Sequence, residues 1–347
     1  MDDINFSKRQ LILSIVAVAL VVVITLALII VTSIFWIPLL IITSPILLIL
    51  GLLVKFTNLG SPFQQAYYKA YDWVFYKSER PRKFMWSLIY NTMCLLYPST
   101  QWKAMNYGYS VLSGNGHLIQ NLQAEDEDER FCLQLYHYIA TQFGSVKNLN
   151  GLRVLEVGSG RGGGLNYISR YLNPQECFGV DFSENQIRFC RHHYSQNKKL
   201  QFFKGDSQAL DQIPEIQENS FDVAINVESS HCYGNFDQFI QQINRALKPG
   251  GFFCFTDFRT ELECQQLDTY FKSLPYFQVI KSEDITVNVL QSLKQDEKRR
   301  SSLIEGNVSK LLKPFFRKFS GLKGTRIFQE FEEKKTLYVA YILQKKL

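Results

Sequence analysis

The stretch Arg153-Val154-Leu155-Glu156-Val157-Gly158-Ser159-Gly160-Arg161-Gly162-Gly163-Gly164 decides the fold of this 347-residue chain. Its first half is a short, mainly apolar run, which predicts a buried strand over 153–157. Its second half is rich in glycine, which lets the backbone turn sharply and leaves no side chain between the chain and a ligand. We therefore expect a strand, a tight ligand-binding loop and a helix that begins at Leu165.

Short apolar strands alternate with amphipathic helices from residue 150 onward, a pattern typical of an α/β domain with a parallel sheet. The strands predicted from this pattern cover 153–157, 176–181, 200–204, 221–227 and 251–257. Open α/β sheets bind ligands at the carboxyl ends of their strands. Asp181, Gly205-Asp206 and the loop 226–233 all fall at such ends, and the turn Leu247-Lys248-Pro249-Gly250-Gly251 leads into the fifth strand.

Taken together, these stretches resemble the class I S-adenosylmethionine-dependent methyltransferases over residues 100–347. Within them the chain resembles the phthiotriolone and phenolphthiotriolone dimycocerosate methyltransferases and, more loosely, the sterol C-methyltransferases. The first likeness rests on residues 135–137, 140–142, 155–157, 162–164, 226–228, 230–233, 288–290 and 324–325, and the second on 106–109. The resemblance implies a Rossmann-like sheet with a helical lid over about 285–330 and a last antiparallel strand over 336–343.

The same resemblance implies that the chain is an enzyme with S-adenosylmethionine as its cofactor. Gly158 and Gly160 would face the methionine part, Asp181 the ribose and Asp206 the adenine. The further cofactor contacts expected on these grounds are Glu156, Ser159, Gly162, Phe182, Ser207 and Asn226. The GxGxxG spacing alone also fits a nicotinamide enzyme, but Gly205-Asp206 and the absence of a second mononucleotide half argue against that class.

Methylation of a hydroxyl needs a base, and His231 is the first candidate because neutral imidazole accepts a proton near pH 7. Asp257 would orient the imidazole or hold the substrate hydroxyl, and Glu228 is a second carboxylate for the orienting role. An ordinary loop histidine and an ordinary turn aspartate remain the alternatives. Tyr107 and Tyr109 are expected to line the acceptor pocket as part of a lid, with simple packing as the alternative.

Leu11 to Val54 is a run of 44 residues without a charge, whereas one membrane-spanning helix needs roughly 20. We predict a transmembrane hairpin with spans of about 11–31 and 37–54, preceded by a short cytosolic segment, 1–10. Basic residues flank the run on both sides, which places the catalytic domain on the cytosolic side, with the endoplasmic reticulum as one candidate membrane. Pro38 and Pro45 leave open a re-entrant second segment, and a buried core hairpin is the remaining alternative.

Residues 55–130 are rich in aromatic and basic side chains, which suit either a juxtamembrane helical region or a helical cap on the substrate side. The acidic run 125–129 is expected to complement the dipole of a helix over 131–143 rather than to bind a metal. Residues 303–322 predict amphipathic helices over the substrate side, and 131–347 form the methyltransferase domain with its lid.

The composition excludes several classes of protein. The chain is 46% hydrophobic and 20% charged, with a formal net charge of +6, which is too mildly basic for a dedicated nucleic-acid binder. Its seven cysteines are scattered without a CxxC pair, so we predict neither a disulfide framework nor a metal site.

We therefore expect a membrane-anchored methyltransferase that O-methylates a hydrophobic, lipid-like hydroxyl acceptor. The alternatives are a sterol-type C-methyltransferase and a catalytically silent methyltransferase-like membrane scaffold. The identity of the acceptor and the oligomeric state stay open at this point.

Overall fold

The computed structural model describes residue 69 and residues 79–96, 101–142, 148–310 and 312–347. The chain divides into two units, residues 1–73 and 74–347, and the second carries the features below. The predicted membrane hairpin, residues 11–54, lies outside the described residues. Within those ranges, no helix is both long and apolar enough to cross a bilayer.

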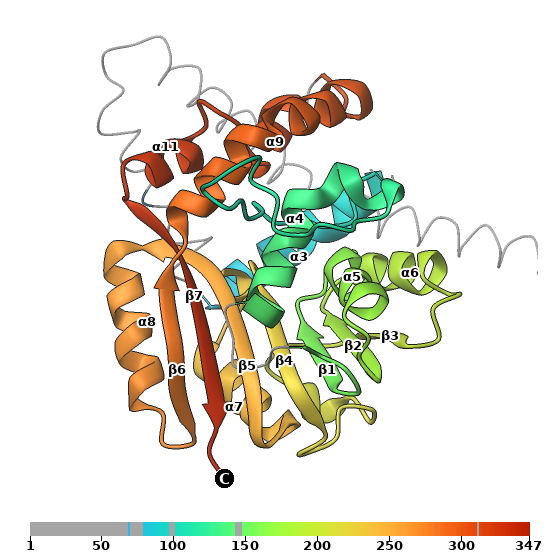
Figure 1. Cartoon of the computed structure of the whole chain (residues 1–347), viewed down its shortest axis with the longest axis vertical. Coiled ribbons are helices and arrows are strands. Elements are labelled where there is room, and N and C mark those ends of the chain that lie inside the picture. Colours follow the sequence, from blue (N-terminus) through green and yellow to red (C-terminus); the bar gives the residue numbers. More distant parts are fainter. Residues whose placement is uncertain (1–68, 70–78, 97–100, 143–147, 311) are drawn as a thin grey trace, which may run out of the picture. The chain divides into compact units, whose positions relative to one another are not determined.

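A seven-stranded sheet forms the centre of the second unit, with the strand order β3-β2-β1-β4-β5-β7-β6 (Figure 1). The strands are β1 (Arg153–Val157), β2 (Glu176–Asp181), β3 (Leu200–Lys204), β4 (Phe221–Val227), β5 (Leu247–Thr260), β6 (Phe277–Asp284) and β7 (Thr336–Lys345). Neighbours among the first five are parallel, whereas β7 runs antiparallel to β5 and β6. This confirms the Rossmann-like sheet and its antiparallel last strand.

The first four strands have the predicted bounds, but β5 is longer than predicted. Leu247 pairs with Phe221 of β4, and the register then shifts before Phe252 pairs with Val223. The segment predicted as a turn, 247–251, is therefore the irregular beginning of the strand. Pairing with a neighbouring strand has overridden the local turn signal of proline and glycine.

Alternate residues of the strands enter two separate cores, one on each face of the sheet, as the period of two requires. Val154 of β1 packs in one core with Ile168 and Ile187. Its neighbour Leu155 packs in the other core with Phe239. Helices therefore cover both faces, which makes the sheet a three-layer scaffold for its carboxyl edge.

The helices either cover the sheet or form a cap beyond its edge. They are α3 (Glu79–Leu96), α4 (Arg130–His137), α5 (Gly163–Tyr171), α6 (Glu184–His193), α7 (Phe236–Ala246), α8 (Glu261–Ser273), α9 (Thr286–Asn307), α10 (Lys313–Phe319) and α11 (Arg326–Glu332). Figure 1 shows α9 and α11 beyond the end of the sheet to which the arrow of β6 points. The predicted lid thus corresponds to α9, α10 and α11.

Two local expectations need correction. The predicted helix over 131–143 is divided into α4 and a π-helix, Tyr138–Gln142, and α5 begins at Gly163 rather than Leu165. The acidic run lies in a 3-10 helix, Ala124–Glu129, where Asp126 accepts hydrogen bonds from Arg170 and Tyr171. Asp126 thus also holds distant segments of the chain together, and the expected interaction of the run with the dipole of α4 stays a prediction.

Candidate functional site

A cavity that opens to solvent lies at the carboxyl edge of the sheet, with about 930 Å³ of empty space when its open mouth is included. Val157 and the glycine loop after β1 line it, as do Val227 and the loop after β4. Strands β1 and β4 are adjacent in the sheet, and the strand order runs outward from them in opposite directions. The cavity therefore lies at the topological switch point, where open α/β sheets bind their ligands.

The glycine loop forms one wall of the cavity through its backbone. Gly158 has φ +82°, and a Cβ atom there would lie 2.2 Å from Oγ of Ser229. Gly164 lies in the first turn of α5 against Tyr136, where a Cβ atom would lie 2.0 Å from the ring. Any side chain at these two positions would displace the loop, so the close approach requires glycine.

Asp181 fixes the geometry between this loop and the end of β2. Its Oδ2 accepts the Gly160 N–H at 2.9 Å, and its Oδ1 accepts the Ser183 N–H at 2.8 Å. Burial raises the pKa of Asp181, and the two backbone donors oppose that rise. The carboxylate borders the cavity together with the neighbouring Phe182, whose side chain is partly exposed.

The end of β3 adds a second carboxylate to the cavity wall. Asp206 accepts hydrogen bonds through Oδ1 from both the backbone N–H and the side-chain amide of Gln208, each at 3.1 Å. Ser207 lines the cavity beside it. Gly158, Ser159, Gly160, Asp181, Phe182, Asp206 and Ser207 thus border one cavity, at the strand ends where the sequence placed them. Gly162 does not line it, and a Cβ atom there would lie 2.7 Å from the ring of Phe202.

Glu156 and Asn226 do not line this cavity; both are fully buried behind it. Glu156 accepts the hydroxyl of Tyr136 at 2.7 Å through Oε1, and its Oε2 has no hydrogen-bond partner. Burial raises the pKa of Glu156 to about 8. Asn226 donates to the Val157 carbonyl and to Ser229 Oγ, each at 2.8 Å, so it braces the loop from behind.

Glu228 follows β4 in a conformation that is rare for a residue other than glycine, with φ +44°. Its Oε1 accepts the backbone N–H of Tyr107 and the hydroxyl of Tyr338, each at 2.6 Å. Burial raises the pKa of Glu228 to about 7, although both donors lower it. Glu228 is therefore a cavity-lining carboxyl group that titrates near neutral pH.

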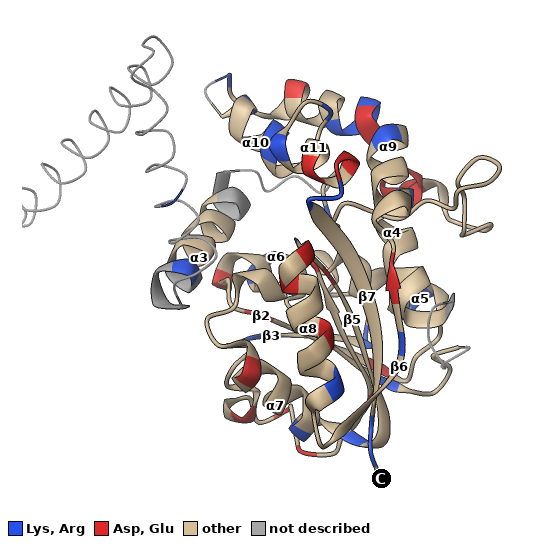
Figure 2. Ribbon diagram, turned by 90° about the vertical axis from the view of Figure 1, so that its left-hand side faces the viewer, with Lys and Arg blue, Asp and Glu red and all other residues tan. Residues whose placement is uncertain are grey.

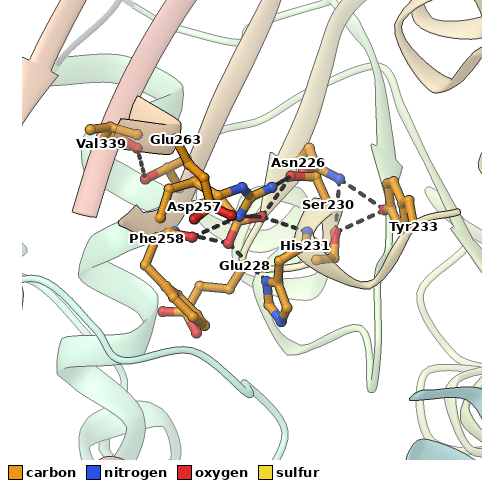
Figure 3. A network of polar contacts seen from close by, with 12 residues as sticks. Asn226, Glu228, Ser230, His231, Tyr233, Asp257, Phe258, Glu263 and Val339 are labelled. Carbon is orange, nitrogen blue, oxygen red and sulfur yellow. Dashed lines mark hydrogen bonds and ion pairs between the residues drawn. The ribbon is translucent and has the colours of Figure 1, made fainter. Parts of the chain in front are cut away.

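His231 and Asp257 form a buried pair at the ends of β4 and β5, as Figure 3 shows. Asp257 Oδ1 lies 2.9 Å from His231 Nδ1, and its Oδ2 accepts the His231 backbone N–H at 3.0 Å and the Ser230 hydroxyl at 2.6 Å. Arg259 lies 3.1 Å from the same carboxylate. The expected orienting contact of Asp257 with the imidazole is therefore present.

The surroundings of this pair shift the pKa values of both groups. Burial lowers the pKa of His231, but Cys232 and Asp257 outweigh it and raise the pKa to about 10. Burial raises the pKa of Asp257, but Arg259 and His231 hold it well below its usual range. The contact with Asp257 therefore favours the imidazolium over neutral imidazole, and the role of His231 as the base stays a prediction.

His231 is also set back from the cavity. Cys232 lines the cavity, whereas His231 does not. The His231 ring packs edge-on against Trp86, with 5.6 Å between ring centroids, and against Phe258 at 4.7 Å. Trp86, which does line the cavity, lies in contact with the imidazole.

Helix α3 supplies a part of the site that the sequence did not reveal. Trp86, Ser87 and Tyr90 line the cavity. Asn91 holds the helix in place by accepting the hydroxyl of Ser183 at 2.8 Å, at the beginning of α6. The aromatic and basic composition of 55–130 fitted either a juxtamembrane region or a cap. It did not show which residues line the cavity, because nothing local marks the contact between α3 and α6.

Tyr107 and Tyr109, expected to line an acceptor pocket, are both buried and lie outside the cavity lining. Tyr109 stacks on Tyr138 at 4.1 Å, and the Tyr107 ring packs against Phe258 and Phe331. Tyr107 still shapes the site, since its backbone N–H holds Glu228. Sequence reasoning gave no role in the site to Tyr233, which lines the cavity, or to Tyr338, which donates a hydrogen bond to Glu228.

The comparisons with known proteins agree with this geometry. A family model described as a methyltransferase domain matches residues 148–330. The chain is 32% identical over 224 residues to the phthiotriol/phenolphthiotriol dimycocerosates methyltransferase of Mycobacterium leprae, covering 65% of this chain and 79% of that protein. It is 32% identical over 241 residues to the fatty-acid O-methyltransferase of Mycolicibacterium smegmatis. That similarity covers 70% of this chain and 82% of that protein.

Among solved structures, the geranyl diphosphate C-methyltransferase of Streptomyces coelicolor A3(2) has a TM-score of 0.52 against this chain. The similarity covers 77% of this chain and 98% of that protein, at 12% sequence identity. At so low an identity the likeness concerns the fold alone.

Proposed function

Because the chain belongs to the S-adenosylmethionine-dependent methyltransferases, we propose that it transfers the methyl group to an oxygen atom of a hydroxylated, lipid-like acceptor. S-adenosylmethionine is the methyl donor, and its sulfonium supplies an activated methyl group, so the chain itself mainly aligns the acceptor and removes its proton. The relatives named for dimycocerosates and fatty acids support a lipid-like acceptor.

The residues around the cavity fit this cofactor. Asp181 presents a carboxylate at the end of β2, where a ribose would be held, and Asp206 lies at the end of β3, on the adenine side. Gly158 and Gly160 offer backbone without side chains for the methionine part. We assign Asn226 and Glu156 to the support of this wall, because neither reaches the cavity.

The proton of the acceptor hydroxyl passes to Glu228 in this proposal. The observation that carries it is that one cavity joins Asp181 and Asp206 to Glu228. A carboxyl group whose pKa is about 7 is ionised in half of the molecules at neutral pH and suits general-base catalysis there. His231 and Asp257 then act as a fixed imidazolium-carboxylate pair that positions the loop after β4.

Residues 11–54 anchor the enzyme to a membrane in this proposal, with the catalytic domain on the cytosolic side. The support is the run of 44 uncharged residues, flanked by basic residues on both sides. A glycosylation acceptor inserted between Thr32 and Pro38 tests the hairpin. Modification places that turn in the lumen, and absence of modification contradicts the two-span arrangement.

Transfer of a labelled methyl group by the full chain tests the reaction, with a long-chain secondary alcohol and a long-chain fatty acid as separate acceptors. We expect methylation of the alcohol, with loss of activity in Glu228→Gln. A hydroxyl must lose its proton, whereas a carboxylate is already an anion at pH 7. Methylation of the fatty acid alone, equally fast in Glu228→Gln, would contradict both the hydroxyl acceptor and the role of Glu228.

A further inference from the structure

Residues 306–329 form a stretch of concentrated positive charge that the proposed methyl transfer does not use. The stretch contains no acidic residue and six basic ones, Lys310, Lys313, Arg317, Lys318, Lys323 and Arg326. We refer to it as the basic segment, and it comprises α10 and the beginning of α11. Figure 2 shows basic residues and no acidic residue on α10.

Neighbouring carboxylates offset only part of this charge. Glu305 lies within ion-pair distance of two of the basic side chains, and Glu330 lies within that distance of a third. Lys310 and Lys323 are exposed, and neither forms an ion pair with another residue that the structure describes. These two lysines can therefore meet an anionic surface without losing a partner first.

Helix α10 has a buried face and an exposed face. Phe316 is 2% exposed and packs on Trp102, with 5.6 Å between ring centroids. Phe315 is 41% exposed, and Lys318, three residues later on the same face of the helix, is exposed as well. An exposed aromatic ring among cations is typical of helices that lie on an anionic bilayer, where such rings enter the headgroup region.

A series of aromatic contacts joins the exposed face of α10 to the cofactor cavity. The ring of Phe315 stacks on Phe319 with 6.2 Å between centroids, and Phe319 contacts Tyr90 at 6.1 Å. Tyr90 stacks on Trp86 at 5.8 Å, and both of these residues line the cavity. Apolar side chains therefore connect the outer surface of α10 with the proposed site of methyl transfer.

We propose that the exposed face of α10 lies on the headgroups of an anionic lipid bilayer. Lys310 and Lys323, on either side of α10 in the sequence, face the anionic headgroups, and the Phe315 ring enters the interface. A bilayer fits this face better than an acidic protein does, because it offers an apolar layer beneath its charges. A lipid-like acceptor then reaches the cavity along Phe319 and Tyr90. This route rests on the proposed function, whereas the lipid contact does not.

Photocrosslinking of the full chain in lipid vesicles tests the contact. Benzoylphenylalanine replaces Phe315 in one variant and Leu262 in the control, because Leu262 is 63% exposed on α8 but lies between Glu261 and Glu263. In vesicles of phosphatidylcholine and phosphatidylserine, position 315 should crosslink to lipid severalfold more than position 262. Equal yields at the two positions, or crosslinking of position 315 to a second copy of the chain instead of lipid, would overturn the proposal.

The role of the charges is tested by Lys310→Gln and Lys323→Gln in one chain. Each lysine removed from an anionic surface should weaken the contact about fivefold, so the yield at position 315 should fall towards that in phosphatidylcholine alone. Lys198→Gln with Lys272→Gln removes the same charge from exposed positions outside the basic segment and should leave the yield unchanged. An equal fall in both double variants would assign the effect to the net charge of the chain and contradict the proposal.

Turnover separates the lipid contact from the proposed methylation. The variant that lacks Lys310 and Lys323 should methylate a long-chain secondary alcohol in the vesicles more slowly than wild type, and a short-chain alcohol in solution at the wild-type rate. An equal loss with both alcohols would contradict the acceptor route. If wild type methylates neither alcohol while position 315 still crosslinks to lipid, the proposed function fails and the lipid contact stands.

Discussion

The end of the cofactor cavity beside β1 and β2 is built mainly of backbone, whereas the end beside β4 and β5 is built of side chains. At the first end, positive-φ glycines form the wall, and one carboxylate, Asp181, accepts two backbone N–H groups. At the second end, Glu228 lines the cavity and the pair His231–Asp257 lies behind it, and these side chains are held by partners from several segments. We refer to them as the cofactor end and the acceptor end.

The two ends differ in how far apart in the sequence the contacting residues lie. Asp181 and Gly160 are 21 residues apart, within one strand-loop-helix-strand unit. Glu228 depends on Tyr107 and Tyr338, which are 121 and 110 residues away. The cofactor end therefore follows from a local motif, and the acceptor end depends on how the whole domain closes. Changes at the acceptor end should affect catalysis, and changes at the cofactor end should affect binding.

Glu228→Gln should separate the effects on catalysis from those on cofactor binding most clearly, because it removes the base and preserves the shape of the side chain. We expect kcat to fall by about 10² to 10⁴, with cofactor affinity changed less than about tenfold. His231→Asn, three residues later, should reduce kcat by less than about tenfold, because the imidazolium only positions the loop. Single-turnover measurements distinguish the two, and the reverse order would assign the base to His231.

The next effect concerns stability at the acceptor end. Asp257→Asn should destabilise the fold by about 3–5 kcal/mol, because it leaves the buried charges of His231 and Arg259 without their carboxylate. Asp268→Asn is the matched control, since its pair with Lys272 is exposed and contributes at most about 0.5 kcal/mol. Urea unfolding measures both. A similar loss of unfolding free energy in the two variants would mean that the His231–Asp257 pair does not hold the loop after β4.

Because the cofactor end is built mainly of backbone, we expect Gly158→Ala to weaken the binding of S-adenosylmethionine. The methyl group would meet Ser229 Oγ at 2.2 Å in a strained conformation, so S-adenosylmethionine should bind about 30-fold more weakly, or about 2 kcal/mol. Gly151→Ala has the same kind of positive φ, but nothing lies within 4 Å of its Cβ position. Calorimetry should find its cofactor affinity unchanged, and unchanged affinity in both variants would refute a backbone-built cofactor wall.

The smallest effect is a shift in pH dependence. Glu228 must be ionised to act, so kcat/KM should rise with pH through about 7. The Tyr338 hydroxyl lowers the pKa of that carboxyl, so Tyr338→Phe should move the rise to higher pH by up to about one unit. Tyr341→Phe, on the same strand, should leave the profile in place. An unshifted Tyr338→Phe profile would show that another group titrates.

The same pKa sets the sign of a stability effect. The pKa of Glu228 is raised above its ordinary value in the folded chain. Its contribution is therefore most favourable at acidic pH, below the ordinary carboxyl range, and is lost as pH rises through about 7. Glu228→Gln should remove this part of the pH dependence of unfolding.

The sequence was a good guide to the cofactor end and a poor one to the acceptor end. The run from Arg153 to Gly164 predicted β1 and its loop, and the apolar run 176–181 predicted the position of Asp181, because strand periodicity and glycine chemistry act over a few residues. The sequence did not reveal Trp86 of α3 in the cavity or Tyr338 on Glu228. Both contacts join residues that are far apart in the chain and carry no motif.

His231 illustrates the remaining difficulty. Its place after β4 and its partner Asp257 were predicted, and the structure has the two 2.9 Å apart. The direction in which its pKa shifts was not predicted, because the pKa of the imidazole depends on how deeply the pair is buried and on the charges around it. Residue type and position predicted the contact, and the charge state needed the packed structure.

Binding of S-adenosylmethionine by the full chain tests the account most directly. Asp181→Ala should weaken binding about 10- to 100-fold relative to wild type, since it removes a charged hydrogen-bond acceptor from the cofactor end. Asp211→Ala, at an exposed position, should bind as wild type does. Failure of folded wild-type protein to bind, or equal binding by Asp181→Ala, would contradict the cofactor site described here.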